Sequence, residues 1–162
     1  MRRLALATMF ALIAAGAAAQ PSDQVWQLNS DAANITAAKS KFVLTAGALQ
    51  WNTAKPEATT FALSLDTTSL GDTAVKTELG ASPEMRVITT TPGRKSGDTI
   101  SLPTAVTVGS ITKTVTLQVN YKMNGRQIDM HAEGTLKSSD FKLKGPDIAL
   151  VMDAPFKPAL GQ

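Results

Sequence analysis

The sequence predicts an all-β domain, and three observations support that prediction. Threonine is abundant, helix signals are scarce, and turn residues recur at short spacing along the chain. About eight short strands joined by short turns suit an antiparallel up-and-down barrel or a β-sandwich. No internal repeat or low-complexity linker interrupts residues 20–162, so we expect these residues to form one domain.

Residues 1–19 are typical of a cleavable export signal and are excluded from the fold. Arg2 and Arg3 precede an apolar, alanine-rich run over residues 4–19 that ends in three alanines. At 1.5 Å per residue this run spans roughly 24 Å, less than the ~30 Å hydrocarbon core of a bilayer. We therefore expect cleavage after Ala19, a periplasmic or secreted protein, and no integral membrane segment after cleavage.

The composition that remains after cleavage argues against several classes of partner. Without Arg2 and Arg3, 14 basic residues face 13 acidic residues, so the net charge falls from +3 to +1. This balance, with no basic stripe between aromatic residues, predicts no nucleic-acid partner. The chain has no cysteine, so it has no disulfide. A domain of 143 residues (162 minus 19) can bury about two-thirds of its unfolded surface without one.

The clearest predicted element is a β-hairpin. Apolar and polar residues alternate over Thr112–Met123, and the alternation resumes from Ile128 to Lys137. Between the two runs lies Asn124-Gly125, the strongest two-residue hairpin signal.

The register of this hairpin can be predicted from its turn. With Asn124 and Gly125 as the two central turn residues, Tyr121 faces Ile128 and the polar His131 faces Gln118. Apolar then meets apolar along one side, as a half-buried antiparallel pair requires.

The other elements are less sharply marked. One short helix is expected between Asp72, as N-cap, and Gly80, and Gly47 is expected to mark a bend or bulge. The polar residues 92–98 are expected to form an ordinary hairpin loop. The remaining strands are predicted over Val25–Ser30, Lys41–Trp51, Thr59–Thr68, Met85–Thr91, Thr99–Val108, Phe141–Leu143 and Asp147–Asp153.

Residues that could carry catalysis or bind a metal are scarce. His131 is the only histidine, and without cysteine or a second imidazole it has no partners for a metal site. No phosphate-binding glycine loop, nucleophile elbow or calcium-loop spacing is present. We therefore expect no enzyme activity, no catalytic residue, no metal and no cofactor, with His131 solvated at the surface.

The alternating strands supply a continuous apolar face. Such a face forms either a packed core or a lumen for a hydrophobic ligand, and alternation is the same in both cases. The pattern of residues leaves the two readings open.

Several segments occur in the order found in the YceI-like family of exported, lipocalin-like barrels. The spacing of Phe42, Gly47, Leu49 and Trp51 resembles the family's F-x4-G-x-I-x-F pattern. Ser110, Ser138 and Lys142 depart from the family, which has Gly, Arg and Gly there, and the segment 72–82 is shorter than its helical insertion. The other similar segments are Val25–Asn29, Leu65–Asp72, Ser82–Val87, Val106–Lys113 and Ser139–Phe141.

This resemblance implies a single antiparallel eight-stranded lipocalin-like barrel with one short helix near its mouth. It also implies that the lumen holds a hydrophobic ligand, an isoprenoid-like or fatty amphiphile. The alternative is a filled barrel that acts as a non-enzymatic periplasmic interaction or stress-response module; the oligomeric state, including a dimer, stays open. The candidate lumen residues are Phe42, Trp51, Leu63, Leu65, Val87, Val106, Val108, Leu117, Val119, Tyr121, Met130 and Phe141.

Overall fold

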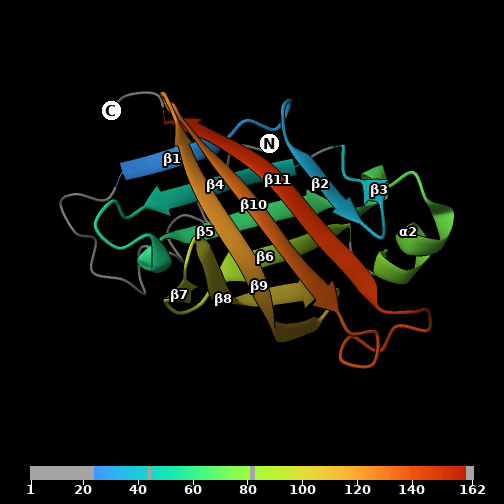
Figure 1. Cartoon of the computed structure of the whole chain (residues 1–162). Coiled ribbons are helices and arrows are strands. Elements are labelled where there is room, and N and C mark those ends of the chain that lie inside the picture. The colour runs from blue at the N-terminus through green and yellow to red at the C-terminus, as the bar shows by residue number, and fades with distance from the viewer. Residues whose placement is uncertain (1–23, 44, 81–82, 160–162) are drawn as a thin grey trace.

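Eight antiparallel strands close into a barrel in this computed structural model, which describes residues 24–43, 45–80 and 83–159 (Figure 1). The ring closes because the last strand pairs with the first. The predicted all-β, eight-stranded barrel is thereby confirmed, whereas the expected signal segment 1–19 lies outside the described residues. In ring order the strands are β1 (Gln24–Leu28), β4 (Thr45–Trp51), β5 (Thr60–Asp66), β6 (Glu84–Thr89), β8 (Thr99–Val108), β9 (Ile111–Asn124), β10 (Gln127–Leu136) and β11 (Ile148–Pro158).

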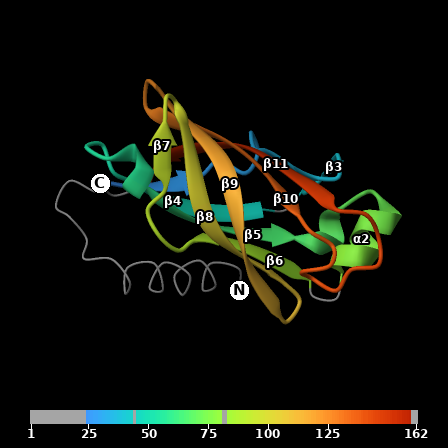
Figure 2. The same cartoon turned by 60° about the horizontal axis from the view of Figure 1, so that its bottom comes forward.

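Short strands and helical segments flank this ring. β2 (Asn34–Ala37) pairs with β11 and with β3 (Ser40–Lys41), while β7 (Arg94–Ser96) pairs with the start of β8. Figure 2 shows β7 toward one end of the barrel and the helix α2 at the other. The helical segments are η1 (Pro56–Ala58), η2 (Thr67–Ser69) and α2 (Thr73–Leu79).

The predicted short helix is confirmed, together with its N-cap. The Asp72 carboxylate accepts hydrogen bonds from the backbone N–H groups of Ala74 (2.9 Å) and Val75 (3.1 Å), which the first helical turn leaves without helical partners. Leu79 is fully buried and joins the core, and Gly80 follows as C-cap. The helix thus covers the end of the barrel at which β5 ends and β6 begins.

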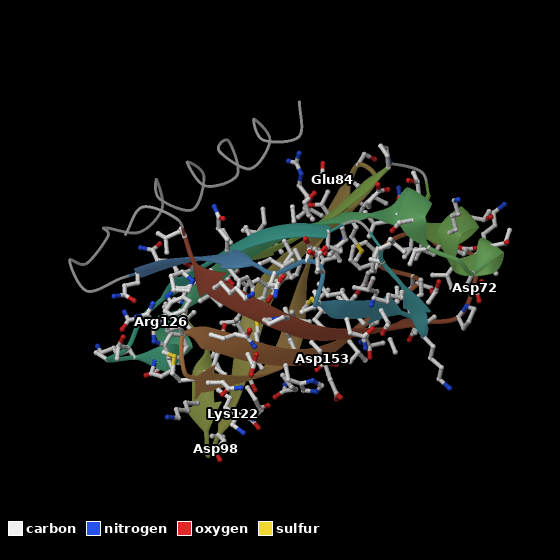
Figure 3. All side chains as sticks on the ribbon, turned by 90° about the horizontal axis from the view of Figure 1, so that it is seen from above. Asp72, Glu84, Asp98, Lys122, Arg126 and Asp153 are labelled. Atoms are coloured by element: carbon white, nitrogen blue, oxygen red, sulfur yellow. The ribbon has the colours of Figure 1, made fainter. Side chains whose placement is uncertain are left out.

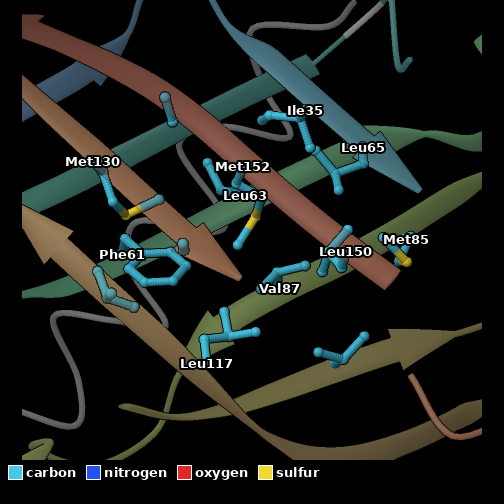
Figure 4. Close-up of a cluster of buried hydrophobic side chains, with 14 of the residues drawn as sticks. Ile35, Phe61, Leu63, Leu65, Met85, Val87, Leu117, Met130, Leu150 and Met152 are labelled. Carbon is cyan, nitrogen blue, oxygen red and sulfur yellow. The ribbon is translucent and has the colours of Figure 1, made fainter. Parts of the chain in front are cut away.

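The interior of the barrel holds the hydrophobic core. Every second residue of β8 is buried, and the same alternation occurs in β9 from Val115 to Val119 and in β10 from Ile128 to Ala132. Side chains from β5, β6, β9, β10 and β11 meet in the middle (Figure 4). The labelled charged residues lie around the periphery (Figure 3), so the alternation sorts apolar side chains inward and charged ones outward.

The hairpin forms as predicted, but its register differs: each residue of β9 faces the β10 residue two positions beyond the predicted one. Met130 faces Tyr121 and His131 faces Asn120, so the predicted pairings Tyr121–Ile128 and His131–Gln118 are wrong. The turn residues are Gly125, with φ +61°, and Arg126. Glycine in the first central position is typical of a type II′ turn, whereas the prediction had placed Asn124 first and Gly125 second. The shift preserves parity, so apolar residues still face inward.

The predicted strand Phe141–Leu143 is wrong, because this segment is a turn. The N–H of Leu143 donates to the carbonyl of Ser138 (2.9 Å), and Lys142 has a left-handed φ of +55°. The chain therefore reverses here, although Phe141 is still buried against the core.

Three other expectations need correction. Lys41–Trp51 is divided between β3 and β4, because Phe42 N–H donates to the carbonyl of Ile35 and ties the first part to β2. Gly47 marks no bulge: it pairs in regular register with Leu63, whose side chain would overlap a Cβ at that position. The loop 92–98 contains the strand β7, and β2 was not predicted.

Candidate functional site

The twelve candidate lumen residues all lie on the inner side of the barrel or against its core. Eleven of them are buried, and Tyr121 is partly exposed but packs against the same cluster. Because they come from many strands and two connecting segments, the closed ring is what brings them together. Their position agrees with the prediction; a role in ligand binding stays a prediction.

Side chains fill the middle of this interior. Phe61, Leu63 and Leu117 have no exposed area, so no water-sized space borders them. The interior is also uncharged: among the described residues, the buried polar side chains belong only to threonine and serine. The barrel therefore encloses a dry apolar core rather than an aqueous channel.

Two aromatic rings close the end of the barrel opposite α2. The ring centroids of Trp51, at the end of β4, and Tyr121, in β9, are 5.4 Å apart, with an angle of 73° between the ring planes. Three strands separate β4 from β9 in either direction around the ring. The edge-to-face contact, a favourable geometry for aromatic pairs, therefore spans the barrel.

This aromatic end contains polar atoms without hydrogen-bond partners among the described residues. Trp26 Nε1, Trp51 Nε1 and Tyr121 Oη are all buried, although Tyr121 as a whole residue is partly exposed. Burial raises the pKa of the Tyr121 hydroxyl well above its usual value, so the group is a neutral donor at ordinary pH. Leaving a buried donor unsatisfied costs about 1–3 kcal/mol. Sequence reasoning counted Trp51 and Tyr121 only as apolar lining, did not include Trp26 among the lumen residues, and missed all three donors.

A fourth such atom lies outside the barrel. Thr60 Oγ1 is also buried without a partner, but Thr60 pairs with Gln50, on the face opposite to that of the Leu49–Phe61 pair. Since successive residues of a strand point to opposite faces, the Thr60 side chain points outward. Thr60 therefore differs from Trp26, Trp51 and Tyr121, whose polar atoms belong to the interior.

The barrel wall has a seam near the α2 end. β9 and β10 pair only from Gln118–Glu133 to Asn124–Gln127; beyond Gln118, β9 stays with β8, while β10 stays with β11. A groove of about 730 Å³ lies between the diverging strands. A Cβ on Gly134 would overlap the side chain of Leu117, so Leu117 packs across this seam. Side-chain packing, rather than a β-ladder, closes the wall here.

His131 lies on the outer face, as predicted, but it is not an isolated surface histidine. Its Nδ1 is 2.6 Å from Asp153 Oδ1, and its Nε2 is 3.2 Å from Glu133 Oε1. The hydrogen bond with Asp153 raises the pKa of His131, partial burial opposes this, and Glu133 adds to the increase. Sequence reasoning missed the contact with Asp153 because it did not fix which strand lies beside β10.

The described part of the chain contains neither a metal-binding cluster of His, Asp and Glu nor a helix long and apolar enough to span a bilayer. Surface grooves border the strands, and one of them is lined by His131 together with Lys122, Asp129 and Asp153. We take the interior and its aromatic end as the candidate site, because the apolar side chains and the donors without partners gather there.

Comparison with known proteins identifies the fold. No protein-family model matches the sequence, and no curated protein matches it significantly. Among solved structures, BcnA of Burkholderia cenocepacia superimposes with a TM-score of 0.69 at 13% identity, covering 79% of this chain and 98% of BcnA. The YceI protein of Campylobacter jejuni gives a TM-score of 0.64 at 14% identity, covering 75% of this chain and 85% of that protein. The chain therefore has the YceI-like fold, as the order of its sequence motifs predicted.

Proposed function

We propose that this protein is an exported, non-enzymatic binding protein that holds the apolar chain of an isoprenoid-like or fatty amphiphile inside its barrel. The observation that carries the proposal is a continuous, uncharged apolar interior enclosed by a barrel of the YceI-like fold. Each buried CH₂ contributes about 0.8 kcal/mol, so a long chain can bind with few polar contacts. Residues 1–19 would direct the protein to the periplasm.

Binding would require the interior to rearrange, and its composition suits that requirement. Met85, Met130 and Met152 project into the core from three different strands (Figure 4). Methionine is unbranched and readily adopts other rotamers, so it can yield space to an apolar chain. The seam at Leu117 and Gly134, held by side chains, supplies a place at which the wall can open with little loss of backbone hydrogen bonding.

A filled barrel acting as an interaction module is the second candidate. The absence of exposed area on Phe61, Leu63 and Leu117 favours it. An interaction module also calls for an exposed apolar patch. Among the described residues, the large hydrophobic side chains that are exposed are those of Val43, after β3, and Met123, near the hairpin tip, in different parts of the chain. This scatter favours interior binding.

Two measurements test the proposal. Protein made in its native host is extracted with organic solvent for lipid mass spectrometry, and delipidated protein is titrated with a fluorescent polyprenyl probe. We expect a co-purifying amphiphile and saturable uptake near one probe per chain. Leu63→Phe, which adds volume to the interior, should weaken uptake, whereas the surface control Thr116→Ser should not. Lipid-free protein without saturable uptake would favour the filled barrel instead.

A further inference from the structure

We infer that the aromatic end of the barrel, defined by Trp26, Trp51 and Tyr121, binds an uncharged, oxygen-bearing end group of the ligand, such as a hydroxyl or a carbonyl. This inference rests on the proposed function and specifies both the ligand class and its direction in the barrel.

The three residues converge from three strands. Trp26 in β1 pairs with Leu49 in β4, which makes Trp26 the diagonal neighbour of Trp51 on the inner face. Tyr121 comes from the opposite side of the ring and contacts Trp51. All three polar atoms are buried and have no partner among the described residues, so this one end of the interior gathers donors that the described part of the chain leaves unsatisfied.

The chemistry of these atoms selects an acceptor. An indole N–H can only donate a hydrogen bond, and the tyrosine hydroxyl, which burial keeps neutral, can donate or accept. A hydroxyl or carbonyl oxygen has lone pairs for such donors. A pure hydrocarbon would leave them unsatisfied, so it would gain less from binding here.

The absence of positive charge argues against a phosphate or carboxylate. No lysine or arginine is buried among the described residues. The cations of the nearby hairpin, Lys122 and Arg126, are exposed and lie at the periphery (Figure 3). An anion at the aromatic end would lose its hydration without gaining a counter-charge, which is strongly unfavourable.

The opposite end of the barrel gives the ligand its direction. Near α2 the interior includes Leu65, Leu79 and Met85, all fully buried, while the buried Thr67 at this end already takes part in an interaction. The three apolar side chains have no hydrogen-bonding N–H or O–H group. The oxygen would therefore lie at the aromatic end, beside Trp51 and Tyr121, with the hydrocarbon tail running toward α2.

Three C15 probes with one chain and different ends test this inference: farnesol, the hydrocarbon farnesene, and farnesyl phosphate. Each displaces a fluorescent polyprenyl reporter from delipidated protein. We expect farnesol to bind more tightly than farnesene by about 2- to 12-fold for each hydrogen bond gained, and farnesyl phosphate to bind most weakly.

Variants then assign the preference to named atoms. Tyr121→Phe keeps the ring but removes the hydroxyl, so it should reduce the farnesol-to-farnesene affinity ratio by a similar factor. Thr60→Val is the matched control, because it removes a buried, unpartnered hydroxyl that points outward. It should leave the ratio unchanged.

The possible failures are distinguishable. Equal binding of farnesol and farnesene, tighter binding of farnesyl phosphate, or an unchanged ratio in Tyr121→Phe would overturn the inference and leave lumen binding standing. If neither the reporter nor any probe binds, the proposed function fails, and this inference fails with it.

Discussion

Trp51 and Tyr121 lie on opposite sides of an eight-stranded ring, yet their aromatic rings touch across it, with centroids 5.4 Å apart. This contact joins the β4 wall to the β9 wall at the end away from α2. Neither residue has a sequence neighbour that predicts the contact, because it arises only when the ring closes.

The Trp51–Tyr121 contact should be measurable as an energetic coupling. In a double-mutant cycle with Trp51→Leu and Tyr121→Leu, we expect a coupling free energy of about 0.5–1.5 kcal/mol, because an edge-to-face pair stabilises beyond its burial. Urea unfolding of the four proteins measures it. As a control, the stability losses of Trp51→Leu and Phe141→Leu should be additive, because Phe141 lies near the α2 end of the barrel. A coupling of zero for the aromatic pair would show that its geometry contributes nothing.

Lys142 occupies a backbone conformation that favours glycine. Its φ is +55°, and glycine stands at the corresponding place in the family motif that Ser139–Phe141 resembles. Lys142→Gly should therefore raise the free energy of unfolding by about 0.5–1 kcal/mol. This gain is the backbone strain that glycine relieves, reduced by the greater conformational entropy that glycine gives the unfolded chain. Lys142→Ala removes the side chain but keeps the strain, so it should give no such gain. Equal stabilisation by both variants would place the cause in the side chain.

His131 should make stability depend on pH. Its pKa is raised in the folded state, chiefly by the hydrogen bond with Asp153, so protonated His131 stabilises the fold fully below the unfolded pKa of about 6.5. This stabilisation is lost as the pH rises through the folded pKa. Because the three side chains are largely exposed, the contribution should not exceed about 1 kcal/mol.

Comparing urea unfolding at pH 5.5 and 8.5 checks this dependence. His131→Gln should remove the contribution of this group and leave reporter binding unchanged. A wild-type contribution that increases toward pH 8.5 would contradict the sign. Loss of binding in folded His131→Ala would show that the outer face has a function.

A charge in the core should be far more damaging than the same charge outside. Leu117→Asp or Val119→Asp buries a carboxylate without a partner and should cost several kcal/mol. Thr116→Asp places it on the exposed face of the same strand and should change stability by less than about 0.5 kcal/mol. Thermal unfolding of the three variants separates the two faces of β9. Similar losses in all three would mean that the assigned faces are wrong.

The seam makes Gly134 sensitive to a single methyl group. Gly134→Ala would push its Cβ into the Leu117 side chain, so we expect a loss of about 1–3 kcal/mol from overpacking. Gly71→Ala is the control, because nothing lies within 4 Å of the added Cβ. Urea unfolding compares the two. If Gly134→Ala is as stable as the wild type, Leu117 is free to move away from the seam.

The hairpin of β9 and β10 separates what alternation can predict from what it cannot. Alternation fixes parity, which assigned Leu117 and Met130 to the inner face and His131 to the outer one. A register shift that moves the facing residue by two along its strand leaves parity unchanged, so the same pattern allowed His131 to face either Gln118 or Asn120. The turn geometry at Gly125 made the choice.

The candidate site was predicted in the same partial way. The sequence identified the inward residues and, through the order of its motifs, the eight-stranded barrel. It did not predict the three unsatisfied donors, because an aromatic residue in an alternating strand contributes to a core whether or not its N–H or O–H finds a partner.

By itself, the sequence determined the strand-rich character of the chain, the inner and outer faces, and the Asp72-capped helix, because these depend on residues a few positions apart. Only the tertiary structure decided that β11 lies beside β1 and β10, that β9 and β10 separate at Gly134, and that Trp51 meets Tyr121. These relationships join residues far apart in the chain, and backbone hydrogen bonds and packing select them only once the whole sheet closes.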